Sequence, residues 1–168
     1  GVGTRISATG TAGNASDRQY ATLMNKPAGI TPKMIGMTRS TNGKSYYLLA
    51  TNGNLYSMGE NESRQLGTGN TTDYSEWQLV TATSGTNTLG GNIAWISPQE
   101  HEGGNYAAIN IITNDGKLWA WGNSDTGMLG ASGTINPTFM PGSTTGTYNP
   151  GKLNTSDKLI AVETGGHT

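Results

Sequence analysis

The sequence predicts an all-β protein assembled from a repeated unit of short antiparallel strands. First, residues 53–67 recur as residues 116–130, displaced by 63 positions, and a period of this length indicates a repeat architecture. Second, the hydrophobic content of 33% lies below the usual globular share and disfavours a layered domain with long helices. Third, 26 Gly and many Ser, Thr and Asn residues favour many short strands joined by polar turns.

The two copies agree at the positions that a strand and a following tight turn require. Each copy has Gly, Leu, an aromatic residue, Gly, Leu and Gly in the same register. Glycine permits the positive φ of a tight turn, and leucine supplies apolar contacts. The matched pairs are Gly53 and Gly116, Leu55 and Leu118, Gly59 and Gly122, Leu66 and Leu129, and Gly67 and Gly130.

The first copy predicts three strands in order. Residues 34–37 form a short apolar run, and residues 46–50 have the aromatic and aliphatic character of a buried strand. Asn52 and Gly53 predict a two-residue hairpin, because both tolerate positive φ. Residues 55–58 then return as the next strand.

The second copy predicts the same order of elements, with its first strand matched to residues 34–37. Residues 81–91, between the copies, are expected to form a polar surface linker. The corresponding parts are residues 93–96 for the first strand, 106–113 for the buried strand, Asp115-Gly116 for the hairpin and 118–121 for the return strand.

The two ends of the chain resemble incomplete copies. Residues 159–162 match residues 93–96, and Gly1 aligns with Gly67, which closes the turn of the first copy. We therefore expect an internal segment of a longer repeat array. Its expected parts are residues 1–33 (the tail of a preceding repeat and a linker), 34–91 (the first repeat), 92–157 (the second repeat) and 158–168 (the start of a third).

Several short motifs of the repeat resemble those of a known repeat family. They are Gly165-Gly166-His167-Thr168, Asp115-Gly116, Trp121-Gly122, Gly127-Met128-Leu129-Gly130 and Gln65-Leu66-Gly67. Together they resemble the regulator-of-chromosome-condensation (alpha-tubulin-suppressor-like) repeat family. The first copy departs from this pattern, with Met58 where the second copy has Trp121 and Arg64 where it has Gly127.

The resemblance implies a β-propeller, in which each repeat is a blade of four antiparallel strands and the blades stack around an axis. The chain would then be an incomplete segment of a larger propeller. The implied role of His167 is a hydrogen bond to backbone within its blade. Structural roles are implied for Gly53, Leu55, Gly59, Leu66, Gly67, Gly116, Leu118, Trp121, Gly122, Gly127, Leu129, Gly130 and His167.

The composition limits the classes of function. The absence of cysteine excludes disulfides, thiolate metal sites and cysteine nucleophiles. A net charge of −1 without a basic run gives no electrostatic footprint for nucleic acid. No apolar run approaches the roughly 20 residues that cross a bilayer. We expect neither a nucleic-acid partner nor a membrane span.

No group of side chains indicates catalysis or a metal site. His101 lies between Glu100 and Glu102, but adjacent residues of an extended chain point in alternating directions, and no second ligand cluster is visible. The sequence therefore predicts neither an enzyme nor a cofactor. Turn formation explains the acidic residues at recurring positions, which are Glu60, Glu62, Asp115 and Asp125.

The composition favours a non-enzymatic interaction module of a larger secreted or surface-exposed protein, on a bacterial cell or a phage virion. Charged residues make up only 12% of the chain, and its Gly, Thr, Ser and Asn loops resemble those of adhesins and phage structural proteins. The expected partners are a protein or surface glycan, and further blades of the same longer chain or another protomer. The candidate contact residues in loops are Tyr74, Trp77, Phe139 and Tyr148.

Two other classes of function stay open. The founding member of the family implies an exchange factor that releases nucleotide from a small GTPase through loops on one propeller face. A fold does not by itself transmit such a function. Propellers also host hydrolases and lyases near the central axis, although no catalytic motif of that kind is present in this sequence.

Overall fold

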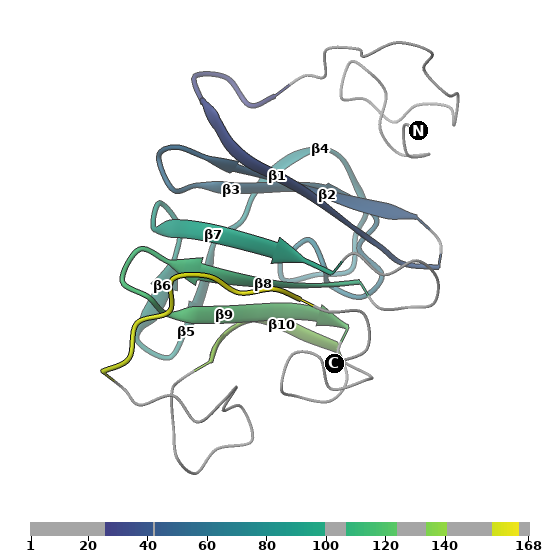
Figure 1. Cartoon of the computed structure of the whole chain (residues 1–168). Helices are drawn as coiled ribbons and strands as arrows, with labels where there is room; N and C mark the ends of the chain where they lie inside the picture. Colours follow the sequence, from purple (N-terminus) through teal and green to yellow (C-terminus); the bar gives the residue numbers. More distant parts are fainter. Residues whose placement is uncertain (1–25, 42, 100–106, 124–133, 141–155, 165–168) are drawn as a thin grey trace.

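The computed structural model describes residues 26–41, 43–99, 107–123, 134–140 and 156–164, with the side chains of residues 138–140 excepted (Figure 1). These residues contain no helix, and so none of the length and apolarity that a bilayer crossing requires. The strands are β1 (Pro32–Arg39), β2 (Lys44–Ala50), β3 (Leu55–Gly59), β4 (Tyr74–Leu79), β5 (Ala82–Ser84), β6 (Asn87–Leu89), β7 (Ile93–Pro98), β8 (Ala108–Thr113), β9 (Leu118–Asn123) and β10 (Thr134–Met140).

Eight of these strands form two antiparallel sheets of four strands. Blade 1 has the order β1-β2-β3-β4, and blade 2 has the order β7-β8-β9-β10. Strands that are consecutive in the sequence are neighbours in each sheet, so each blade is a simple meander. This arrangement confirms the predicted all-β class and the predicted four-stranded antiparallel blades.

The first strands of the two blades correspond in a register that the sequence comparison misses. Met34 pairs with Leu49 in blade 1, and Trp95 pairs with Ile112 in blade 2. Because Leu49 and Ile112 are equivalent, Met34 corresponds to Trp95. The predicted match between these two strands is therefore wrong by two residues. The reason is that a shift of two residues leaves the same side chains on each face of a strand, so the apolar pattern alone does not distinguish the two alignments.

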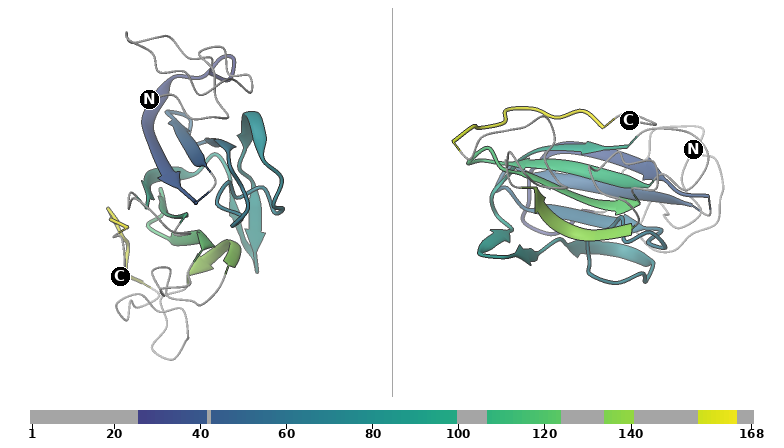
Figure 2. Two further views of the ribbon diagram at one scale, coloured as in Figure 1. Left: turned by 90° about the vertical axis from the view of Figure 1, so that its right-hand side faces the viewer. Right: turned by 90° about the horizontal axis from the view of Figure 1, so that it is seen from below.

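The blades approach each other along their first strands and are separated by a hairpin farther out (Figure 2). The Lys33 ammonium group in β1 donates to the Ala94 carbonyl in β7 at 2.7 Å. The hairpin of β5 and β6 lies between the blades, where β5 packs against β10. The two sheets therefore form a wedge that narrows toward β1 and β7.

The hairpin of β5 and β6 also corrects the expectation of a surface linker between the copies. Residues 82–89 form paired strands, and the Leu89 side chain is only 1% exposed within the main core. The preceding residue Val80 is fully buried in the same cluster. Apolar side chains in an otherwise polar stretch therefore close the wide side of the wedge.

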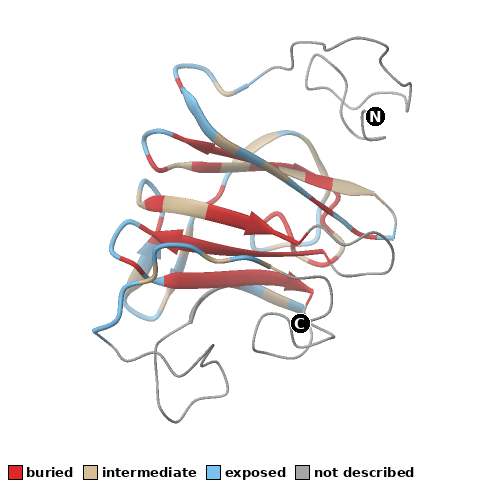
Figure 3. Ribbon diagram, in the orientation of Figure 1, coloured by how far each residue is buried: buried red, intermediate tan, exposed pale blue. Residues whose placement is uncertain are grey.

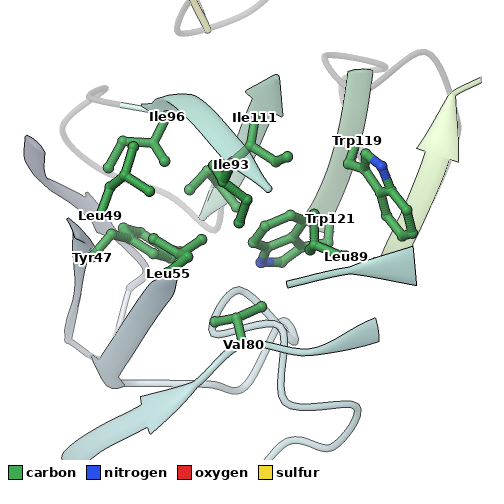
Figure 4. Close-up of a cluster of buried hydrophobic side chains, with 11 residues drawn as sticks. Tyr47, Leu49, Leu55, Val80, Leu89, Ile93, Ile96, Ile111, Trp119 and Trp121 are labelled. Atoms are coloured by element: carbon green, nitrogen blue, oxygen red, sulfur yellow. The ribbon is translucent and has the colours of Figure 1, made fainter. Parts of the chain in front are cut away.

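The main core lies between the facing sides of the two blades (Figures 3 and 4). Alternate residues of a strand point to opposite faces, so each blade gives one apolar row to this core. A sheet of this size does not bury an apolar face by itself. The core consists of Tyr47, Leu49, Leu55, Val80, Leu89, Ile93, Ile96, Ile109, Ile111, Trp119 and Trp121.

One carbonyl oxygen, that of Gln65, accepts hydrogen bonds from both blades. The Tyr47 hydroxyl of blade 1 donates to the carbonyl of Gln65 at 2.6 Å, and Trp121 Nε1 of blade 2 donates to the same oxygen at 2.9 Å. Burial raises the pKa of the Tyr47 phenol, which keeps it a neutral donor. Gln65 lies after β3, so the two aromatic residues fix the base of the following loop.

A double-mutant cycle tests this shared carbonyl. Tyr47→Phe or Trp121→Phe alone leaves the Gln65 carbonyl with one donor, whereas the double variant leaves it buried without one. An unpaired buried acceptor costs about 1–3 kcal/mol, so we expect the double variant to lose about 1 kcal/mol or more beyond the sum of the single losses. Urea unfolding measures each loss.

The matched control replaces Tyr47→Phe by Tyr56→Phe, a change at a half-buried tyrosine of the opposite face of blade 1. Its effect should add to that of Trp121→Phe. Additive losses in the Tyr47 and Trp121 cycle would show that the shared carbonyl does not couple the blades.

Glycine occupies the equivalent position near the end of the third strand in each blade. Gly59 pairs with Ser45, and Gly122 pairs with Ala108. Their φ angles are +112° and +104°, in the region that favours glycine. A Cβ at Gly59 would lie 2.2 Å from the carbonyl oxygen of Lys44. A side chain therefore does not fit at this strand end.

We predict that Gly59→Ala lowers the free energy of unfolding by about 2–4 kcal/mol, because it adds a backbone clash to an unfavourable φ. Gly69→Ala is the matched control, since Gly69 has φ +80° but no atom within 4 Å of an added Cβ. The control should lose about 1 kcal/mol. Equal losses in urea unfolding would refute the clash as the cause.

Residues 156–164 follow blade 2 in the place that β7 takes on blade 1 (Figure 1). The Leu159 amide donates to the Gly116 carbonyl at 3.0 Å, and the Ile93 amide donates to the Gly53 carbonyl at 3.0 Å. Gly53 and Gly116 occupy equivalent hairpins. The predicted repeat boundaries, including the start of a third repeat, stay predictions, and this equivalence supports them.

Candidate interaction surface at the loop end

The two ends of blade 1 differ in the length of their connections. A tight hairpin joins β2 to β3 at one end. At the other end, residues 60–73 connect β3 to β4 beside a short turn in which the Ser40 amide donates to the Gly43 carbonyl at 2.9 Å. We call this second end the loop end. The matching connections of blade 2 include residues 100–106 and 124–133, which lie outside the described residues.

Asn61 holds the loop together from inside. Its side chain is fully buried. Its Oδ1 accepts from the Leu66 amide at 2.9 Å, and its Nδ2 donates to the carbonyls of Asn70 at 2.9 Å and Thr72 at 3.0 Å. Its backbone amide donates to Asp73 Oδ1 at 2.8 Å. One residue therefore connects the start, the middle and the end of the loop.

Hydroxyl groups of the sheet tie the base of the loop to blade 1. Ser45 Oγ donates to the Glu60 carbonyl at 2.7 Å, and Ser57 Oγ donates to the Leu66 carbonyl at 2.7 Å. Both serines are buried. A buried hydroxyl that pairs with a backbone carbonyl satisfies two polar groups at once. The loop is thereby held in one position on the blade.

Arg64 has the backbone conformation that the sequence pattern assigns to glycine. Its φ is +60°, and it is the non-glycine residue with positive φ in the described part of the chain. Arg64 Nη1 donates to the Gly69 carbonyl at 3.3 Å and to Asn136 Oδ1 of β10 at 3.1 Å. A guanidinium has five N–H donors, so the half-buried Arg64 can also donate to a partner.

Two observations concern the acidic side chains of the described residues. No three His, Asp or Glu side chains lie close enough to hold a metal ion among the residues that the structure describes. At the hairpin end, a hydrogen bond from the Thr113 hydroxyl and the nearby Lys117 ammonium lower the pKa of Asp115. Asp115 is therefore a carboxylate near neutral pH.

The described motif residues lie where turns and the core require them. Leu55, Leu66 and Trp121 are fully buried, and Leu118 is 5% exposed. Positive φ angles occur at Gly53, Gly59, Gly67, Gly116 and Gly122. The implied roles of all the motif residues in the repeat stay predictions, and four of these residues lie outside the described part of the chain: Gly127, Leu129, Gly130 and His167.

Three of the four aromatic candidates for partner contact lie in strands, which corrects their expected loop position. Tyr74 and Trp77 belong to β4, and Phe139 belongs to β10. Tyr148 lies outside the described residues. Aromatic residues suit the half-buried surface of a strand, which explains the error. The Tyr74 hydroxyl accepts from Asn70 Nδ2 at 3.0 Å at the edge of the loop. A contact role for these residues stays a prediction.

The sequence comparison does not single out Asn61 as a loop-organising residue. Its hydrogen-bond partners extend from Leu66 to Asp73, so its role depends on the folded loop. An asparagine two residues after the strand-ending Gly59 is the only local signal for it. Asn is common in such turns because its side chain bonds nearby backbone.

Comparison with known proteins identifies the repeat. Residues 52–97 match the family "Regulator of chromosome condensation (RCC1) repeat". The chain carries an RCC1 repeat. The matched stretch runs from the β2–β3 hairpin, through the loop end, to β7. The resemblance inferred from the motifs is confirmed. No curated protein sequence matches the chain.

Solved structures show the same fold. Human WBSCR16 has a TM-score of 0.56 at 16% identity, over 83% of this chain and 34% of that one. Prp20p from Saccharomyces cerevisiae, which binds Gsp1p and histones, has a TM-score of 0.51 at 15% identity, over 79% of this chain and 32% of that one. Yeast RCC1 (Prp20) bound to Kap60 has a TM-score of 0.58 at 16% identity, over 96% of this chain and 35% of that one.

These comparisons support the fold of an RCC1-like propeller. The chain spans about a third of the length of each of these structures. Its two blades therefore have the fold of a segment of such a propeller. At this level of identity, what the relatives bind does not transfer to the chain.

We predict that Asn61→Asp destabilises the protein by about 1–3 kcal/mol. The carboxylate keeps an acceptor for Leu66, but it loses the donor to Asn70 and Thr72 and places a buried charge beside their carbonyls. Asn52→Asp is the matched control. Asn52 is exposed and accepts from the Asn54 amide at 3.0 Å, a bond that Asp retains.

Thermal and urea unfolding should show a change within about 0.5 kcal/mol for the control. A loss of equal size at both positions would mean that the burial of Asn61 does not stabilise the loop.

Proposed function

We propose that the RCC1-type blades are a non-enzymatic interaction module that binds a protein or surface glycan through the loop end. The observation that supports this most is the internal hydrogen bonding of residues 60–73 around Asn61. These bonds fix the backbone of the loop before any partner arrives. A preorganised loop loses little conformational entropy on binding, and Arg64 and Tyr74 lie at its surface as half-buried side chains.

We further propose that the module belongs to a secreted or surface-exposed protein, on a cell or a virion, where it serves adhesion, receptor contact or assembly. The low share of charged residues, 12%, the 26 Gly and the lack of Cys support this location. Protease treatment of intact source cells or virions tests it. Cleavage of the protein while a cytosolic marker stays intact is the expected result, and full protection would contradict the location.

Site-specific photo-crosslinking tests the loop end itself. A photoreactive amino acid replaces Thr71, an exposed residue of the loop, and the same group replaces Thr86, an exposed residue of the β5–β6 turn, as the control. On intact source cells or virions, we expect a discrete adduct from position 71 only. Arg64→Glu should reduce its yield about tenfold, because a reversed charge opposes the acceptor that Arg64 meets.

Two outcomes would contradict the loop-end hypothesis. One is an adduct of equal yield from position 86. The other is an adduct from position 71 that Arg64→Glu leaves unchanged. In both cases binding would have to involve a different surface of the blades.

A second candidate is an exchange factor for a small GTPase. It is favoured by one observation, the fold similarity to Prp20p, a protein that binds Gsp1p. The test is release of labelled GDP from a panel of small GTPases in the presence of the full chain. Release accelerated by the chain and abolished by Arg64→Glu would support this candidate, and unchanged release across the panel would remove it.

A further inference from the structure

The guanidinium of Arg64 uses only one of its three nitrogens within the described protein. Nη1 donates to the Gly69 carbonyl at 3.3 Å and to Asn136 Oδ1 at 3.1 Å, and both bonds lie at the protein surface. Nε and Nη2 make no hydrogen bond or ion pair to any residue that the structure describes. These two nitrogens form one edge of the planar group, which suits two parallel hydrogen bonds to a carboxylate. We call it the Arg64 edge.

The backbone of Arg64 is held in a conformation that is unfavourable for a residue with a side chain. Its φ is +60°, and the second copy of the repeat has Gly127 at this position. The Arg64 amide donates to the Asn61 carbonyl, and the Arg64 carbonyl accepts from the Gly67 amide, both at 3.0 Å. A glycine would make these two bonds without strain. Strained residues of this kind concentrate at binding sites, so the side chain requires a reason beyond the turn.

The two acceptors of Nη1 fix the plane of the guanidinium. Gly69 belongs to the same loop as Arg64, whereas Asn136 belongs to β10 of blade 2. The N–H groups of a guanidinium lie in one plane in a fixed fork, so acceptors on two separate elements set its orientation. A long side chain that is already held loses less conformational entropy when a partner binds. The Arg64 edge is therefore preorganised.

The charge of Arg64 determines which acceptor the edge suits. None of the acidic side chains that the structure describes forms an ion pair with Arg64, although its loop contains Glu60, Glu62 and Asp73. A partner that covers the edge removes water from a full positive charge, and a neutral acceptor does not compensate for this loss. The three acidic residues oppose a doubly charged phosphate more strongly than a singly charged carboxylate. The chemistry therefore favours a carboxylate.

We propose that the Arg64 edge binds a carboxylate of the partner through two parallel hydrogen bonds, one from Nε and one from Nη2. This inference rests on the proposed function of the loop end and narrows the partner to one that presents an acidic group there. Two sources supply the same chemistry. One is an aspartate or glutamate side chain of a protein, and the other is a uronic or sialic acid of a glycan.

Titration of the full chain with small carboxylates, followed by the NMR signals of the arginine Nε–H groups, tests the proposal. The acidic probes are N-acetylglutamate amide for the protein source and methyl glucuronoside for the glycan source. Their neutral counterparts are N-acetylglutamine amide and methyl glucoside. We expect the signal that Arg64→Lys removes to shift saturably with the acidic probes alone, and the tighter of the two identifies the source. Arg39, exposed in β1, is the internal control.

Two substitutions separate carboxylate binding from a purely structural role of Arg64. Arg64→Lys keeps the charge but has no fork, so binding of the acidic probes, followed on the Gly69 amide, should weaken at least about tenfold. Arg64→Gly removes the strain and keeps the backbone bonds. It should abolish the binding without lowering the midpoint of urea unfolding. A lower midpoint together with unchanged probe binding would show that Arg64 only ties the loop to β10.

Three further results would overturn the proposal. They are neutral probes that shift the Arg64 signal as much as the acidic ones, equal affinity of the acidic probes for Arg39, and tighter binding of inorganic phosphate than of either carboxylate. The titrations need no partner, so they are independent of the crosslinking at position 71. An adduct at position 71 without probe binding refutes the carboxylate alone, whereas probe binding without an adduct refutes the loop end as the partner site.

Discussion

The rest of the structure depends on the contact between one face of blade 1 and the opposite face of blade 2. A four-stranded sheet has two faces and too few residues to cover either one by itself. The contact places Leu55 of one blade in a core with Ile111 and Trp121 of the other. Because each strand alternates its side chains, covering one face leaves the other apolar face requiring a neighbour. The alternation of apolar side chains along the strands is therefore the cause of the stacking of repeats.

The same contact also reaches the loop end. Trp121 belongs to the core of the stacked blades, yet its indole reaches the carbonyl of Gln65 in the loop that follows β3. One residue later, the backbone of Leu66 bonds both Asn61 and Ser57. The loop is therefore attached to the blade contact at its base and closed by Asn61 farther out. The blade contact therefore adds a hydrogen bond to a loop that Asn61 and the serines of blade 1 also hold.

The sequence predicts the parts of this fold that local chemistry determines. The glycine at the strand end follows from turn geometry, and Gly59 shows it with a φ of +112°. The two hairpins lie where Asn52-Gly53 and Asp115-Gly116 predict a turn, but the predicted two-residue form is wrong, because each connection has four residues and Gly53 and Gly116 alone have positive φ there. The sequence does not predict how the first strands of the two blades align, since a shift of two residues keeps the same side chains on each face. Nor does it predict that Leu89 is buried or that Asn61 organises the loop, because both depend on residues that only folding brings together.

Ile35 and Ile96 show why burial in a repeat protein is not a property of the repeat alone. Both are isoleucines at the same position of a first strand, opposite Leu48 in one blade and Ile111 in the other. One is 69% exposed and the other 3% exposed, and the difference lies in whether a blade covers that face. A repeat sequence therefore encodes faces that fit one another. Which of those faces meet is decided by the number and order of blades.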